Sequence, residues 1–149
     1  MYQMPAWPGH VFMASLIIGA AFKGGFEERF AVGVVLLDLI FTQIVRDNRV
    51  RGVHWPEFAT DTMELAAFLA IAMRSTKYWT LAASACALLG VMTHVVAWVD
   101  RRVGTYTYLT AIIVWTWGVM ISIGVGVWGC WRDQLATKRR DALAGATLR

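Results

Sequence analysis

Residues 82–98 read AASACALLGVMTHVVAW, an apolar stretch long enough for several helical turns. Every fourth side chain in it is small or polar until an aromatic ends the series, at Ala82, Cys86, Gly90, His94 and Trp98. Because residues four apart lie on the same side of a helix, we predict one contact face with an ionisable histidine set into it. The small residues of this face predict close packing against another helix.

The composition around this stretch indicates a protein whose solvent is partly lipid. Hydrophobic residues make up 58% of the 149 positions, and charged residues only 16%. Soluble domains usually carry about 25% charge. The mean hydropathy is +0.52, and eight tryptophans suit a chain with many residues at membrane–water boundaries. We therefore expect the lipid bilayer to be a partner.

The net charge of +4 does not indicate a nucleic-acid partner. The basic residues lie between apolar segments and near the end of the chain, as topology signals do. No basic patch with interleaved aromatics occurs, so we expect no nucleic acid to bind.

Polar turns divide the chain into five apolar segments, which predict an all-α, polytopic membrane bundle of about five transmembrane helices with short loops. The first segment is short for a hydrocarbon core of about 30 Å. The expected helices cover residues 5–22, 28–45, 57–73, 78–99 and 105–131. Residues 1–131 then form the transmembrane bundle. Residues 132–149 form a basic cytoplasmic tail, either as a short interfacial helix or without structure.

Five spans leave the two termini on opposite sides of the membrane. Nine basic residues fall on one predicted side: Lys23, Arg29, Arg74, Lys77, Arg132, Lys138, Arg139, Arg140 and Arg149. Five fall on the other: Arg46, Arg49, Arg51, Arg101 and Arg102. The excess of Lys and Arg on the cytoplasmic side of membrane proteins favours a cytoplasmic C-terminus and an outer N-terminus.

A second series of small residues lies in the last segment. Its members are Gly118, Ser122, Gly126 and Cys130, again at every fourth position. Close approach of helix backbones at small residues gains packing contacts in lipid. We expect this face to pair with the face that begins at Ala82, although a partner subunit is an alternative.

Four ionisable residues interrupt the apolar segments: Asp38, Asp61, Glu64 and His94. The predicted topology puts all four in the outer half of the bundle. A charge in hydrocarbon costs about 2.5–3.5 kcal/mol even on lenient scales, so these side chains should point inward and pair. They predict a hydrogen-bonded cluster that holds helices together, a proton or cation site, or a carboxylate–histidine metal site. We assign no metal ligands.

His94 is also a candidate axial ligand for haem or another pigment, because Cys86 and Gly90 leave room beside it. The same small residues serve helix packing equally well, and we expect no cofactor. No Ser-nucleophile motif, phosphate-binding glycine loop or HExxH motif occurs. The sequence therefore predicts that the protein is not an enzyme.

The run from Met73 to Trp79, MRSTKYW, is followed by Thr93-His94 and then by an aromatic segment from Tyr106 to Trp117. In these features the chain resembles a family of small bacterial multi-span membrane proteins of unknown function. Further likeness lies in the Gly-Gly turn of residues 24–29 and in Gly52 before Trp55. The resemblance covers most of residues 23–129 and implies a shared multi-span helical fold. It implies no activity.

Together these features favour a non-enzymatic accessory or structural subunit of a larger inner-membrane assembly, with other membrane proteins as partners. One alternative is a small proton- or cation-coupled transporter that uses the Asp/Glu/His cluster. Another is a haem- or pigment-binding redox or light-harvesting subunit that uses His94.

Overall fold

The computed structural model describes residues 7–46, 55–100 and 104–147, and within these residues the chain is entirely helical. The five helices are α1 (Trp7–Lys23), α2 (Phe26–Arg46), α3 (Trp55–Ala72), α4 (Tyr78–Val99) and α5 (Thr105–Thr147). The predicted bounds of α4 are confirmed. The bounds of α1, α2 and α3 lie one or two residues from the predicted ones. Arg49, Arg51, Gly52, Arg101, Arg102 and Arg149 lie outside the described residues.

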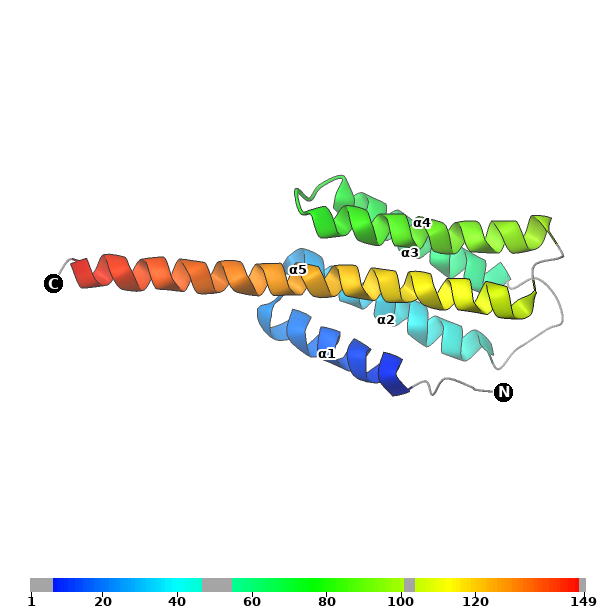
Figure 1. Ribbon diagram of the computed structural model, residues 1–149, viewed down its shortest axis with the longest axis horizontal. Helices are drawn as coiled ribbons and strands as arrows, with labels where there is room; N and C mark the ends of the chain where they lie inside the picture. Colours follow the sequence, from blue (N-terminus) through cyan, green and yellow to red (C-terminus); the bar gives the residue numbers. More distant parts are fainter. Residues whose placement is uncertain (1–6, 47–54, 101–103, 148–149) are drawn as a thin grey trace.

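Two tight turns lie at one end of the bundle, which we call the Lys77 end. Between α1 and α2, the Gly24 amide donates to the carbonyl of Ala20 at 3.0 Å. A Cβ at Gly24 would lie 2.7 Å from that carbonyl oxygen, so only glycine fits there. Between α3 and α4, Ser75 Oγ accepts a hydrogen bond from the Lys77 amide at 3.1 Å. The start of α3, the end of α4 and the start of α5 lie at the opposite end, the His94 end (Figure 1).

The helices follow one another around the bundle. The most extensive packing is between α4 and α5, followed by α3 with α4 and then α2 with α3, while α1 closes the ring against α5 and α2. The core lies between these helices and is mainly apolar, although Glu28, Thr80 and Ser84 are also buried. Its apolar part comprises Met13, Leu16, Ala20, Ala31, Val32, Val35, Phe68, Trp79, Ala83, Ala87, Val119, Met120 and Ile123.

Close packing between α4 and α5 depends on Gly118 and Gly126, two members of the small-residue series predicted in the last segment. A Cβ at Gly118 would lie 2.6 Å from Cys86 Sγ, and one at Gly126 would lie 2.7 Å from the ring of Trp79. Ser122 lies between them, half-buried, with its hydroxyl donating to the Gly118 carbonyl. α4 and α5 therefore approach closely at Gly118 and Gly126, where α5 has no Cβ.

The predicted face of α4 needs a correction, because Ala82 is exposed. Residues four apart on an α-helix are offset by about 40°, so a series from Ala82 to Trp98 turns through about 160°. Its middle members, Cys86, Gly90 and His94, are buried or half-buried, whereas both end members are exposed. At the start of α4 the buried face passes instead through Ala83.

The predicted end of the last helix at Trp131 is also corrected. α5 continues without interruption to Thr147, so the segment from residue 132 is neither a separate interfacial helix nor unstructured up to that point. Every residue from Trp131 to Ala144 is exposed. This extension projects beyond all other helices at the Lys77 end (Figure 1).

Two helices, α4 and α5, are long and apolar enough to cross a membrane. Residues Val11–Lys23 of α1 form a shorter apolar helix. By length and composition, the described part of the chain therefore supports a membrane protein with two candidate spans.

Candidate functional site

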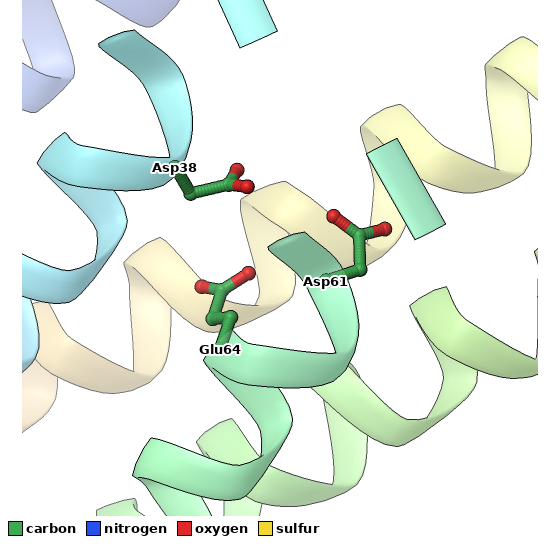
Figure 2. Close-up of side chains that lie close together, drawn as sticks. All are labelled: Asp38, Asp61 and Glu64. Carbon is green, nitrogen blue, oxygen red and sulfur yellow. The ribbon is translucent and has the colours of Figure 1, made fainter. Parts of the chain in front are cut away.

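Three carboxylates from two helices converge inside the bundle. Asp61 and Glu64 are three residues apart on α3 and project from the same side of it, and Asp38 points toward them from α2 (Figure 2). One oxygen of each carboxylate lies within 4.8 Å of the other two. The three residues, which we call the carboxylate cluster, are half-buried.

A small cavity of about 30 Å³ lies beside the carboxylate cluster. Residues of α4 and α5, among them Gly90 and Thr116, complete its wall. A Cβ at Gly90 would lie 4.0 Å from Asp61 Oδ2, so the glycine keeps this side of the cluster open. One water needs about 10–15 Å³ by this measure, so the cavity has room for a water or two, or for a small ion.

The carboxylate cluster lacks a full set of partners. Oδ1 of Asp38 is buried and accepts no hydrogen bond from the described residues. Among these residues, His94 is the one basic side chain that pairs with the cluster. Three like charges this close repel strongly when water is partly excluded, so the cluster needs protons or a bound cation for balance.

His94 connects the carboxylate cluster to α5. Its Nε2 lies 2.7 Å from Asp61 Oδ2, and its Nδ1 lies 2.9 Å from the hydroxyl of Tyr108. When Tyr108 donates to Nδ1, the neutral imidazole carries its proton on Nε2 and donates it to Asp61. When the ring is protonated, both nitrogens donate and the Tyr108 oxygen accepts. The hydrogen bonds of the row Asp61–His94–Tyr108 are therefore satisfied whether the imidazole is neutral or protonated.

Aromatic rings cover His94 at its end of the bundle. Phe58 meets the imidazole edge to face at 6.0 Å between centroids, and Trp55 contacts both Phe58 and Trp98. The side chain of His94 is only 8% exposed. Water therefore reaches the imidazole only with difficulty, while Asp61 is 22% exposed.

The geometry does not fit His94 as a haem or pigment ligand. Both ring nitrogens already have hydrogen-bond partners, so neither is free to bind a metal in this arrangement. The cavity beside the cluster is also far too small for a macrocycle. The three carboxylates, by contrast, offer the oxygen ligands that hard cations prefer.

Sequence reasoning identified Asp38, Asp61, Glu64 and His94, and the structure brings all four together. It missed Tyr108, which lies one turn into α5. A tyrosine near the start of a membrane helix is common as an interfacial residue. Its sequence position therefore carried no signal for a contact with His94.

A second charged cluster, at the Lys77 end, was also missed. Lys77 Nζ lies 2.7 Å from Glu28 Oε1 and 3.0 Å from Glu27 Oε2, and Ser75 Oγ donates to Glu27. Glu28 is fully buried. Burial of Lys77 lowers its pKa, but hydrogen bonds to Glu28 and Glu27 and their negative charges outweigh this and raise the pKa above its usual 10.5. We name Glu27, Glu28 and Lys77 the Lys77 cluster.

Comparison with protein families, curated proteins and solved structures found no match to this chain. Functional inference therefore rests on the site itself.

Proposed function

We propose that the chain is a polytopic integral membrane protein of a bacterial inner membrane, with an outer N-terminus and a cytoplasmic C-terminus. Its surface supports this proposal. Large apolar side chains such as Leu81, Leu88 and Met92 of α4 face outward, where lipid would cover them.

The charge distribution supports the same orientation. Lys23, Arg74 and Lys77 occur at the end from which α5 extends, and the extension adds Arg132 and three further basic residues. Basic residues concentrate on the cytoplasmic side of membrane proteins. In this orientation the carboxylate cluster and His94 belong to the outer half of the bundle.

Within this membrane protein, we propose that the carboxylate cluster is the site of a proton- or cation-coupled transporter. The observation that carries the proposal is the convergence of three carboxylates, one with an unpartnered buried oxygen, around a cavity of ion size. Protons and a cation compete for the same oxygens, so binding of one favours release of the other. The Asp61–His94–Tyr108 row offers a route for the proton toward the His94 end.

The test is flux in liposomes that contain a pH-sensitive dye. We expect the wild-type chain to move protons faster than empty vesicles, under a pH gradient alone or with a gradient of Na⁺, K⁺ or Mg²⁺. Asp61→Asn and His94→Ala should lower the rate to that of empty vesicles. Asp141→Asn, on the exposed extension, is the matched control and should keep the wild-type rate.

Two outcomes of that experiment would contradict the transport proposal. One is a wild-type rate equal to that of empty vesicles under every gradient. The other is an unchanged rate in Asp61→Asn together with a lower unfolding temperature, which would mean that the cluster only holds α2, α3 and α4 together.

A non-enzymatic accessory subunit of a larger membrane assembly is the second candidate. The observation that favours it is an apolar groove of about 620 Å³ between α1, α2 and α5. Groove residues such as Ile17, Leu39 and Trp117 offer contact area to another helix or to lipid. We expect the chain to co-purify with other membrane proteins in stoichiometric amounts from mild detergent, measured by mass spectrometry. Purification as an isolated chain with only lipid would contradict this candidate.

A further inference from the structure

The extension of α5 separates its side chains into two distinct faces. With 100° per residue, Trp131, Arg132, Leu135, Lys138 and Arg139 fall on one side of the helix. We call these five residues the cationic face. Asp133, Thr137 and Asp141 recur at four-residue spacing and fall on the opposite side, which also carries Arg140. Three of the four basic residues therefore share a side with the large apolar residues, and both acidic residues lie away from it.

The cationic face is directed away from the bundle. Gln134, whose Nε2 donates to the Lys23 carbonyl at the end of α1, lies at the edge of this face, about 100° around the helix from its centre. All five residues of the cationic face are exposed, and Trp131 and Leu135 each retain 42% of their surface. Trp131 and Leu135 are four residues apart and therefore adjoin on this side of the helix, so together with the basic residues they form an amphipathic face suited to contact with another surface.

We propose that the cationic face is a docking surface for a partner protein that presents an acidic groove with an apolar floor. The Leu and Trp side chains supply the anchors of a helix-in-groove contact. Arg132, Lys138 and Arg139 pair with carboxylates of the groove, which fixes register and orientation. The inference goes with the accessory-subunit candidate and is independent of the carboxylate cluster.

Geometry argues against lipid headgroups as the occupant. The helix leaves the bundle straight and unbroken (Figure 1), so it does not lie along a membrane surface. At a rise of about 1.5 Å per residue, Arg139 lies about 12 Å beyond Trp131 along the axis. A headgroup layer is only about 5–7 Å thick on each side. With the membrane boundary of α5 at Trp131, as the sequence predicts, anionic lipid reaches Arg132, whereas Lys138 and Arg139 stand beyond it.

Charge argues against a second copy of the chain. Two cationic faces packed together would bring Arg132, Lys138 and Arg139 of each copy against one another. Like charges at a contact are unfavourable and select against that pairing. The complementary surface is therefore acidic. The two acidic residues of the extension, Asp133 and Asp141, share their side of the helix with Arg140 and do not form such a surface.

The test is site-specific photocross-linking in the native membrane with the full chain. A photoreactive residue replaces Leu135 on the cationic face, and in a matched control it replaces Thr137 on the opposite face. We expect a protein adduct from position 135 at least tenfold stronger than from position 137. The linked peptide, identified by mass spectrometry, should carry net negative charge.

Charge reversal completes the experiment. Arg132→Glu combined with Arg139→Glu should lower the adduct from position 135 at least tenfold, whereas Asp133→Lys combined with Asp141→Lys should not lower it. Because all four residues are exposed, the unfolding temperature of each variant should match the wild type. An adduct with phospholipid, an adduct with the same chain, equal labelling from both positions or no adduct at all would overturn the proposal. If stoichiometric co-purification persists without labelling at position 135, the accessory-subunit candidate survives and this docking surface fails.

Discussion

Replacement of Lys77 by Met should lower the free energy of unfolding by about 3 kcal/mol, near the lower end of the range for breaking a buried ion pair. Glu28 is fully buried, and Lys77 Nζ lies 2.7 Å from its Oε1, while its Oε2 has no partner among the described residues. Removal of the ammonium group would leave a carboxylate in the core without a counter-charge. Lys77 itself is 42% exposed, which limits the loss. Unfolding in detergent micelles, followed by circular dichroism, measures it.

The control variants separate charge from packing. Arg74→Met removes an exposed cation from the same turn and should change stability by less than about 0.5 kcal/mol. Glu28→Gln added to Lys77→Met should recover most of the lost stability, because no buried charge then remains. Equal destabilisation by Lys77→Met and Arg74→Met would mean that the ion pair contributes nothing to folding.

The same pair makes the stability of the protein sensitive to alkaline pH. The pKa of Lys77 is raised in the folded chain by its contacts with Glu28 and Glu27, despite the opposing effect of burial. A raised folded pKa gives stability that is fully present below the unfolded pKa and is lost as the pH rises through the folded value. The contribution of Lys77 is therefore constant at neutral pH and declines above about pH 10.5. Lys77→Met should lack this part of the alkaline loss.

The helices were predictable because polar turns interrupt long apolar segments. α4 was the clearest, since Lys77 and Asp100 bracket an uncharged segment of 22 residues. The predicted end of α5 at Trp131 is wrong, because Arg132 begins a charged segment but does not stop a helix. No proline and no glycine lies between Trp131 and Ala144, so nothing in the sequence stops the helix at the predicted membrane boundary.

The members of the candidate site were predictable for an energetic reason. Asp38, Asp61, Glu64 and His94 stand in apolar segments, where an ionisable side chain is costly unless it faces inward. Their partners were not predictable in the same way. The contact between Tyr108 and His94 depends on how α5 is rotated against α4. Glu28 had a sufficient local explanation at the start of α2, where acidic residues favour the helix dipole.

Gly126→Ala should destabilise the protein by about 1–3 kcal/mol, the usual cost of overpacking a core. The added Cβ would lie 2.7–2.8 Å from three atoms of the Trp79 ring. Trp79 is only 7% exposed and belongs to the core. Its rigid ring has no short flexible end that could move aside, so α4 and α5 would have to separate. Thermal unfolding in micelles measures the loss.

Gly129→Ala is the matched control on the same helix, one turn further on. A Cβ at Gly129 meets nothing within 4 Å. Alanine is favoured over glycine inside a helix by about 1 kcal/mol, so this variant should be stabilised or unchanged. The two substitutions are chemically identical and should act with opposite signs. Trp79→Leu added to Gly126→Ala should recover part of the loss, because the smaller side chain gives the new methyl group room. If Gly126→Ala is as stable as Gly129→Ala, then α4 and α5 do not pack as closely as their glycines imply.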